Sequence, residues 1–395
     1  MSEEHAELRA TVRRFLQNRC PEAAVRRAID SDSGYDAQLW SQMAGQLGLH
    51  GLGLPEAYGG SGYGPQETTI VFEELGRALV PSPFFATVAL AAGLLVALGD
   101  QDANQRYLPA IAGGEFIATV AAAEGAASWQ PQDLSDVVAE HRDGQWRLSG
   151  EKTTVLAADA AGLILVVVTA GTQTSVYAVD PGAPGVTVVA LSPLDLTRRQ
   201  SKVRFDNAPA TLVGEHGGAG PAVAAMLDSA SVALAAEQAG AAGYLLQMCM
   251  DYAKLRHQFG RPIGAFQAIQ HMAADMTIGV DGAQLLVREA ISRLAKGQPA
   301  GVEVSQAKAF ANEKCLQAAR MAQQIHGGIG FIAEFDQQLW YRRVAAWSLR
   351  CGTAPEHRAR VAEALLDRPG IVRLGYDLSV DEAPQDVPAR LLGAA

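Results

Sequence analysis

The hydrophobic pattern of this chain changes twice along its 395 residues, and these two changes limit the folds that it can adopt. Up to about residue 114, apolar residues recur at the three- and four-residue spacing of helices, and the same spacing returns from Gly220 onward. Between these parts lie short β-branched runs, such as residues 163–168, bounded by glycine or proline. We therefore predict an α+β protein in which a small β unit separates two helical parts.

Four segments follow from this pattern. An N-terminal helical domain is expected over residues 1–115, and a middle domain that forms a small β-barrel or sandwich is expected over residues 116–215. A C-terminal domain of the four-helix-bundle type is expected over residues 216–366, followed by a loosely held tail over residues 367–395. Strands and helices do not alternate, and no G-x-G-x-x-G sequence follows a strand, so a Rossmann arrangement is not indicated.

The individual elements can be placed by the same patterns. Strands are expected at residues 137–141, 145–148, 163–168, 175–179, 186–191 and 203–205. Long bundle helices are expected over residues 221–257, 264–296 and 301–326. Small residues line one face of the third of these helices: Ala307, Ala311, Cys315, Ala318, Ala322 and Ile325. Such a narrow face lets neighbouring helices approach closely.

Composition excludes several classes of function. The formal net charge is −10 with acidic and basic residues interspersed, which argues against nucleic acid or an anionic membrane as a partner. There is no apolar run of about twenty uncharged residues, so no membrane-spanning helix is expected, and the acidic N-terminus does not resemble a signal peptide. The four cysteines lie far apart and the histidines form no H-x-x-x-H pair, so we expect no metal site and a reducing, cytoplasmic location.

Residues 252–267 join two of the long helices through a turn that contains glycine and proline. This turn is expected to gather Arg256, Gln258 and Gln267 at one corner, beside Phe259. A fixed cation, two amides and an aromatic ring suit an anionic, partly aromatic ligand such as a nucleotide. The same residues also fit an ordinary helix end, with Arg256 near the terminal carbonyl groups of its own helix. Taken by itself, the stretch leaves both interpretations open.

Three stretches together resemble the acyl-CoA dehydrogenase family across residues 1–366. The first is G-L-P-E-A-Y-G-G at residues 53–60, and the second is R-H-Q-F-G-R-P-I with F-Q within residues 256–267. The third is the glycine-rich turn Q-I-H-G-G-I-G-F at residues 324–331. Their order, and the order of the three domains, is similar to that of the family, whose known fold and activity are therefore expected here.

The resemblance implies an FAD cofactor, which in this family lies extended across a subunit interface. The residues that it places beside the ADP half of a flavin seated mainly on a neighbouring subunit are Arg256, Gln258, Phe259, Phe266, Gln267, Gln324, Ile325, Gly327 and Gly328. Arginine can pair with pyrophosphate, and glycines allow backbone N–H groups to approach it. The glycine pair also fits a simple helix stop.

The expected catalytic base is missing. The family removes a proton α to a thioester as a hydride leaves the β carbon, which requires a carboxylate near the flavin. The resemblance places that glutamate either within a Y-E-G-T motif, which here reads R-C-G-T with Cys351 at the base position, or early in the first bundle helix, at Ala230. A thiol is a poor base without an activating cation, although Arg350 is adjacent, and alanine accepts no proton. Asp228, which matches a substrate-contacting position, is a weak candidate.

The flavin-ring side also departs from the family. The T-E-P-x-x-G-S-D loop of the family reads A-A-E-G-A-A-S-W at residues 122–129, in which Glu124 and Gly125 remain. The family's W-I-T, which lies beside the ring, reads T-V-L from Thr154 onward, so the aromatic neighbour and its hydroxyl partner are missing. Glu124, Gly125 and Thr154 are therefore weak candidates for contacts to the ring.

These losses affect the chain's own redox pocket and leave intact the part that reaches a neighbour's cofactor. We therefore expect a subunit that completes the FAD site of a related, catalytic acyl-CoA dehydrogenase subunit, similar to the heteromeric enzymes of actinobacterial sterol side-chain breakdown. Expected partners are an acyl-CoA substrate and an electron-transferring flavoprotein. The alternatives are a homo-oligomeric dehydrogenase whose base is Asp228, Glu124 or Glu237, a non-catalytic interaction protein, and a flavin oxidase or monooxygenase.

Overall fold

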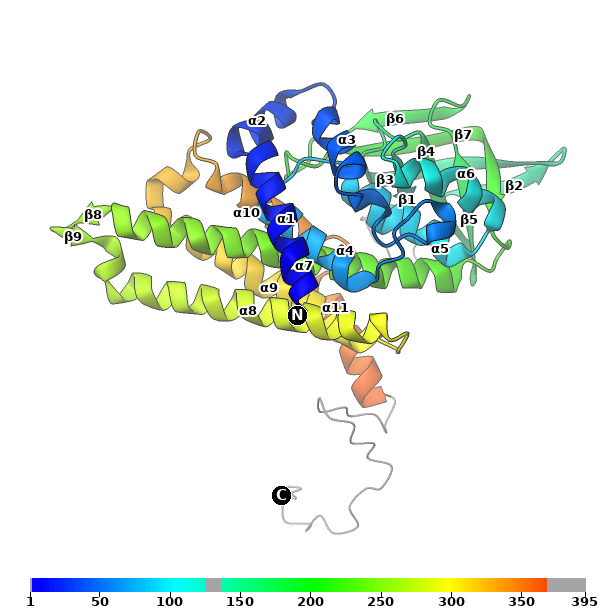
Figure 1. The fold of residues 1–395 in the computed structure, drawn as a ribbon. Helices are drawn as coiled ribbons and strands as arrows, with labels where there is room; N and C mark the ends of the chain where they lie inside the picture. Colours follow the sequence, from blue (N-terminus) through cyan, green and yellow to red (C-terminus); the bar gives the residue numbers. More distant parts are fainter. Residues whose placement is uncertain (1, 126–135, 368–395) are drawn as a thin grey trace, which may run out of the picture.

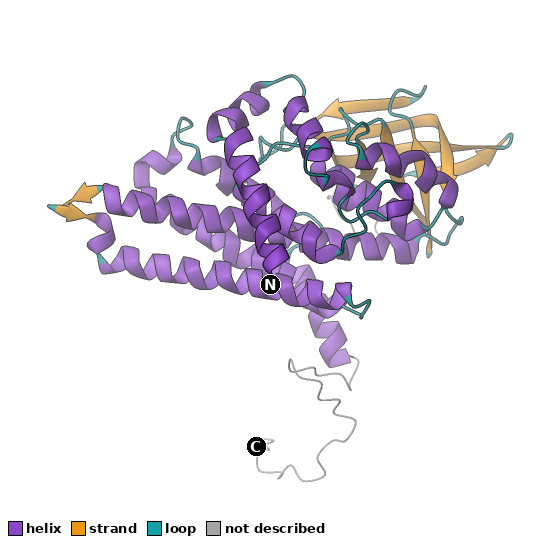
Figure 2. Ribbon diagram, viewed as in Figure 1, coloured by secondary structure: helices purple, strands orange, loops and turns teal. Residues whose placement is uncertain are grey.

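The computed structural model describes residues 2–125 and 136–367. The first part of the chain is helical, as Figures 1 and 2 show. Its α-helices are α1 (Glu3–Arg19), α2 (Glu22–Asp30), α3 (Ala37–Gly45), α4 (Pro65–Arg77), α5 (Gly93–Leu98) and α6 (Gln101–Ala112). Two short 3-10 turns, η1 (Leu49–Gly51) and η2 (Glu56–Tyr58), and the π-helical segment η3 (Phe85–Ala92) complete it.

Local sequence explains where these helices begin. The Ser2 hydroxyl accepts the backbone N–H of His5, and the Asp36 carboxylate accepts the N–H groups of Gln38 and Leu39, so both side chains cap a helix. Helix α4 starts with Pro65, whose missing N–H costs nothing in the first turn. Segment η3 is apolar on all sides and is almost entirely buried, as a helix without a polar face must be.

A seven-stranded sheet forms the middle of the chain. Its strands are β1 (Ala118–Ala121), β2 (Val138–Arg142), β3 (Gln145–Leu156), β4 (Leu163–Ala170), β5 (Gln173–Val179), β6 (Val186–Ala190) and β7 (Gln200–Val213). The strand order is β1-β4-β5-β7-β3-β2, with β6 paired to β7. Strands β1 and β4 run parallel, and the other pairs are antiparallel.

Strand β4 shows how the sheet serves two cores. Ile164, Val166 and Val168 belong to an apolar cluster formed by the β domain alone. Leu163 and Leu165, on the other face, belong to the large core that also contains the helices. Because successive side chains of a strand alternate between faces, a continuous apolar run is what a strand buried on both faces requires.

The last part of the chain is a helical bundle. It contains α7 (Gly220–Leu255), α8 (Gln267–Ala295), α9 (Gly301–His326), α10 (Gln337–Trp347) and α11 (Ala354–Ala362), with the short helical segments η5 (Ile263–Ala265), η6 (Gly327–Phe331) and η7 (Glu363–Asp367). The small-residue face of α9 is buried as expected. Helices α7 and α9 finish at the same end of the bundle, where Tyr252 stacks on His326 with ring centroids 4.6 Å apart.

The predicted fold is confirmed: helices, a middle β domain and a helical bundle follow one another in the expected order. Four details differ. Strand β1 was not expected, because four residues carry too little alternation to be recognised. Strand β7 has 14 residues where only 203–205 was expected, since polar residues on its outer face interrupt the apolar pattern. The helix expected from residue 264 begins at Gln267. Within the predicted N-terminal helical domain, the segment η3 is a π-helix where the sequence pattern indicates only a helix.

Two further observations concern the described residues alone. Within residues 2–125 and 136–367, no helix combines the length and the apolar character that crossing a membrane requires. Over the same ranges, no group of three or more His, Cys, Asp or Glu side chains is arranged to hold a metal ion. The tail predicted to be loosely held lies, from residue 368 onward, outside the described residues.

Candidate functional site

A two-stranded hairpin occupies the predicted corner between α7 and α8. Its strands are β8 (His257–Gln258) and β9 (Arg261–Pro262), and it projects from the end of the bundle away from the large sheet (Figure 1). Phe259 and Gly260 form the tip with φ angles of +53° and +77°. The Phe259 side chain is 93% exposed. The backbone of Phe259 is held in the left-handed region, and its exposed ring has no role in this chain's own core. Both features point to an external partner.

Arg256 stands at the base of this hairpin. Its backbone caps α7, because its N–H donates to the Tyr252 carbonyl at 2.8 Å, so the helix-end interpretation is correct for the main chain. Its side chain is exposed and, within residues 2–125 and 136–367, has neither an ion-pair nor a hydrogen-bond partner. The guanidinium is thus free to bind an anion, and this interpretation is compatible with the first.

The other predicted residues of the hairpin corner surround Arg256 in sequence. Gln267 is the first residue of α8 and is exposed. Gln258 is exposed as well, although its amide nitrogen donates to the His257 carbonyl at 2.7 Å. Phe266 is partly buried and lies under the Arg261 guanidinium, 4.2 Å from the ring centroid. The corner therefore presents cations, amides and aromatic rings together.

The glycine-rich turn after α9 lies at the same end of the bundle. Gln324 is exposed, and a side chain added at Gly328 would meet no atom within 4 Å. Gly327 ends α9 with a φ of +61°, so it is a helix stop that at the same time leaves its backbone accessible. Ile325 does not lie where the predicted contact with the ADP half of a flavin requires. Its side chain is 4% exposed and packs in the core, so it is not available to a ligand.

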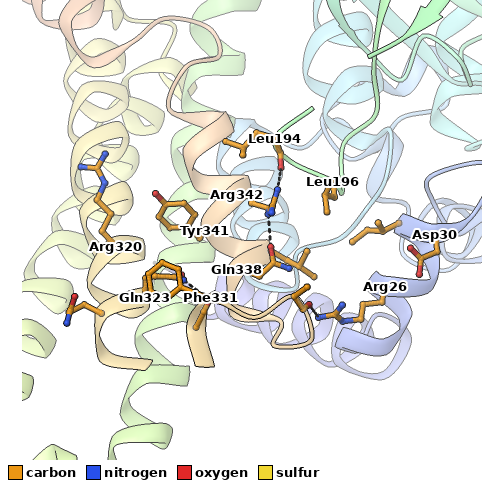
Figure 3. A pocket seen from close by; sticks show the side chains of 15 residues that line it. Arg26, Asp30, Leu194, Leu196, Arg320, Gln323, Phe331, Gln338, Tyr341 and Arg342 are labelled. Atoms are coloured by element: carbon orange, nitrogen blue, oxygen red, sulfur yellow. Dashed lines mark hydrogen bonds between the residues drawn. The ribbon is translucent and has the colours of Figure 1, made fainter. Parts of the chain in front are cut away.

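A pocket of about 670 Å³ opens next to Gln324, between α2, α9, η6 and α10. Figure 3 shows Arg320 on one side of this pocket and Arg26 on the other. Arg26 is paired with Asp336, and Arg342 donates to Gln338 at 2.6 Å. Arg320 has no such partner within residues 2–125 and 136–367. Sequence patterns did not indicate this pocket, because its walls come from segments far apart in the chain.

Ala230 and Cys351, the two positions at which the resemblance expects a base, lie close together in the fold although they are 121 positions apart in the sequence. The Ser231 hydroxyl, next to Ala230, lies 3.4 Å from the Cys351 carbonyl oxygen. Ala230 and Cys351 are both buried. Burial raises the pKa of the Cys351 thiol to about 11, although Arg350 and Lys308 oppose that rise. The thiol is therefore neutral near pH 7 and does not replace a carboxylate.

Buried cations surround this position. Lys308 is fully buried and donates to the Asn312 side-chain oxygen at 2.6 Å and to the Trp347 carbonyl at 2.7 Å. Burial lowers its pKa to about 7. Arg350, 6% exposed, donates to the Thr154 carbonyl at 3.0 Å. Sequence reasoning missed Lys308; the available signal was a single lysine beside the small-residue face of a helix.

The carboxylates proposed as alternative bases are all engaged elsewhere. Glu237 is fully buried and pairs with Arg198 at 2.9 Å and with Arg343 at 2.5 Å, which agrees with a helix-interior residue that has partners. Asp228 pairs with Arg360 at 2.9 Å. Two residues along a helix correspond to a rotation of about 200°, so Asp228 faces away from Ala230. Both carboxylates are therefore held in ion pairs with arginines.

Glu124 is also a structural residue. Its carboxylate pairs with Lys152 and accepts the backbone N–H groups of Asp136 at 2.7 Å and Val137 at 3.2 Å. Both members of the ion pair are almost completely buried. The expected contact of Glu124 with a flavin ring is therefore not available. Gly125 follows it with a φ of +43°, and the remainder of that loop, residues 126–135, lies outside the described residues.

The residues fit one half of FAD and do not fit the other. On the hairpin side, Arg256 is unpaired within the described residues and Gly328 leaves open space, as a pyrophosphate group requires. On the ring side, the Glu124 carboxylate is held in an ion pair, and the Thr154 carbonyl oxygen accepts a hydrogen bond from Arg350. The geometry thus supports binding of a dinucleotide end and gives no support for a flavin ring in this chain's own pocket.

Comparison with known proteins identifies the family of this chain. Residues 2–115 match the acyl-CoA dehydrogenase N-terminal domain family, and residues 218–366 match the acyl-CoA dehydrogenase C-terminal domain family. The chain is 32% identical over 366 residues to the acyl-CoA dehydrogenase IpdE2 of Mycolicibacterium smegmatis, a match that covers 91% of this chain and 98% of that protein.

Two solved structures are similar over nearly the whole chain. One is a variant of the Tcur3481–Tcur3483 steroid ACAD, with 30% identity, a TM-score of 0.83 and coverage of 91% of this chain and 97% of that one. The other is the ChsE4–ChsE5 complex from Mycobacterium tuberculosis, with 27% identity, a TM-score of 0.86 and coverage of 93% and 99%.

Proposed function

Since this chain belongs to the acyl-CoA dehydrogenase family, whose members bind FAD, we propose that it is a subunit of a heteromeric acyl-CoA dehydrogenase and completes the FAD site of a catalytic partner subunit. The complex would introduce an α,β double bond into an acyl-CoA thioester. Both similar solved structures named above are described in terms of two gene products, and a comparable assembly is proposed for this chain.

One observation carries the proposal. The unpaired Arg256 and the open backbone at Gly328 lie at one end of the bundle, whereas the two base positions, Cys351 and Ala230, hold no carboxylate. A chain that performed the reaction by itself would need a proton acceptor beside its flavin. A chain that only completes a neighbour's site needs the residues that bind the dinucleotide, such as Arg256 and Gly328, and needs no base of its own.

Each residue of the corner has a proposed task. Arg256 pairs with the pyrophosphate, and the backbone around Gly327 and Gly328 donates N–H groups to it. Phe259 and Gln267 contact the adenosine side and the partner subunit. Bound FAD would supply the hydride acceptor for the substrate, and the partner would supply the base. An electron-transferring flavoprotein is the proposed electron acceptor, and the complex is proposed to be cytoplasmic.

Flavin content tests the proposal directly. The chain purified alone should be colourless, and the complex co-purified with its partner should be yellow with about one FAD for two chains. In that complex, Arg256→Ala should weaken FAD binding by about 10- to 100-fold, which corresponds to the loss of one charge-assisted hydrogen bond. The readout is FAD fluorescence on titration.

Arg288→Ala is the matched control, since Arg288 is an exposed arginine farther along α8. It should leave FAD affinity unchanged. A lone chain that retains one FAD per polypeptide and bleaches with an acyl-CoA would instead be a self-sufficient dehydrogenase, and the shared-site proposal would be wrong.

A further inference from the structure

Strand β3 and the turn between α10 and α11 touch each other directly. The Arg350 guanidinium, from the turn, donates through Nη2 to the Thr154 carbonyl oxygen at 3.0 Å. Thr154 lies within a register shift of β3 against β7, between Lys152 and Val155, and has a φ of +50°. Such an irregularity frees a strand carbonyl from the sheet ladder, so it can accept a bond from outside the sheet.

The family resemblance places both positions beside the pocket that would receive a flavin ring in this chain. By sequence correspondence, Thr154 stands at the tryptophan of the W-I-T sequence beside the ring, and Arg350 stands immediately before the base position. In this chain a hydrogen bond joins the residues at these two positions. We infer that Arg350 is a latch that holds these positions together and so excludes a flavin ring from this chain's own pocket.

The latch is held from behind by a packed cluster. The Arg350 guanidinium carbon lies 6.0 Å from the centroid of the Trp347 ring, which is itself completely buried. Phe85 packs against Trp347 with ring centroids 5.5 Å apart, and the Arg343 guanidinium lies 5.7 Å from the same indole. Because these neighbours are packed in the core, swinging Arg350 away would open a void beside them.

The charge of Arg350 strengthens its hydrogen bond to Thr154. Burial lowers the pKa of Arg350 to about 10, so the guanidinium stays charged at neutral pH. A hydrogen bond from a charged donor to a carbonyl in a partly buried place is stronger than one between neutral groups.

This inference rests on the proposed function only for the location of the ring pocket, so its test uses the isolated chain and no partner. Cys351 is buried next to Arg350 and serves as the reporter. In the native chain all four thiols should resist maleimide. Arg350→Ala should accelerate labelling of Cys351 at least tenfold, measured by peptide mass spectrometry, while Cys20, Cys249 and Cys315 stay protected. An unchanged Cys351 rate would refute the latch.

Two controls complete the experiment. Arg358→Ala removes an exposed arginine that pairs with Glu313 near the same turn, and it should leave every thiol protected. If all four cysteines of Arg350→Ala are labelled together, that variant is unfolded. The Arg350→Met variant, which keeps the aliphatic stem, is then tested in the same assay, and faster labelling of Cys351 alone is again the expected result. The ring-only probe lumiflavin should not be quenched by the wild-type chain. Saturable one-to-one quenching would overturn the inference without affecting the hairpin proposal.

Discussion

Lys152 and Glu124 form an ion pair inside the β domain, where both side chains are almost completely shielded from water. Burial lowers the pKa of Lys152 to about 8, and the neighbouring carboxylate opposes that shift. The pair also fixes the chain entering β2, because Glu124 accepts the N–H groups of Asp136 and Val137. A residue that resembles a cofactor contact in the sequence is thus part of the framework.

Lys152→Met should therefore destabilise the protein by about 3–5 kcal/mol, because it leaves a buried carboxylate without its cation. The double variant Lys152→Met/Glu124→Gln should recover most of that loss, since no charge then remains buried. Urea unfolding measures both. Lys202→Met is the control, because Lys202 pairs with Glu151 at the surface, and it should cost less than about 1 kcal/mol. Equal losses for the single and double variants would contradict the structural role.

His50 gives a prediction about acid stability. Its ring is fully buried between Trp40 and Phe84, and within the described residues neither ring nitrogen has a hydrogen-bond partner. Burial lowers its pKa to about 3. Below pH 6.5 the unfolded chain takes up a proton that the folded chain refuses, so stability falls as the pH decreases from 6.5 toward 3.

His50→Phe should remove this penalty. We expect the variant to gain about 1 kcal/mol at pH 7.5, where only the unpartnered nitrogens matter, and roughly 2 kcal/mol more at pH 5. Urea midpoints of variant and wild type at the two pH values provide the measurement. A stability difference that does not change with pH would show that His50 has the same pKa in the folded and the unfolded chain.

At the scale of elements, helices α4 and α7 cross at two glycines. A Cβ atom added at Gly240 would lie 1.9 Å from the Glu73 carbonyl oxygen, and one added at Gly76 would lie 2.0 Å from the Glu237 carbonyl oxygen. Backbone atoms cannot yield as flexible side chains do. This crossing therefore sets how closely the N-terminal helices approach the bundle, and it also positions Glu237 for its ion pairs.

Gly240→Ala should destabilise the protein by about 3 kcal/mol, because the two helices must move apart. Gly243→Ala, in the same helix, is the matched control. Its Cβ would meet Val280 at 3.6 Å, an ordinary contact, so the better helix propensity of alanine should stabilise the protein by about 0.5–1 kcal/mol. Opposite signs in thermal unfolding are expected, and a neutral Gly240→Ala would disprove the tight crossing.

Within the described residues, a buried charge network links the three parts of the chain. Arg343 of α10 pairs with Asp195, before β7, at 2.6 Å and with Glu237 of α7 at 2.5 Å. Arg198 joins the same carboxylate and reaches the Val80 carbonyl in the N-terminal part. The large apolar core likewise contains residues of all three parts. The three parts should consequently unfold as one unit.

Two probes test this cooperativity. Far-UV circular dichroism, dominated by helices, and tryptophan fluorescence should give coincident urea transitions. Arg343→Met should lower both midpoints together by the equivalent of about 3–5 kcal/mol, because two buried carboxylates lose a shared cation. Transitions that separate in the wild-type protein would show that the parts unfold independently.

Local patterns in the sequence determined the order of the elements, the buried face of α9 and the corner at Arg256. Periodicity and turn residues act over fewer than about ten residues, so they can be recognised without knowing what packs against them. The hairpin at Phe259 was missed as a hairpin, since strands of two residues have no period. The resemblance to the family also indicated that Cys351 and Ala230 stand where a carboxylate is expected, because that comparison requires only the identity of the residue at each position.

Only the tertiary structure decided what the pocket around those positions contains. Thr154 and Arg350 are 196 residues apart, and their hydrogen bond exists because packing brings a strand bulge against a helical turn. The burial of Lys308, the pairing of Glu124 with Lys152 and the pocket beside Arg320 have the same origin. Contacts of this kind depend on the free energy of the assembled core, which no local pattern encodes, so the chemical state of each side chain emerged only with the fold.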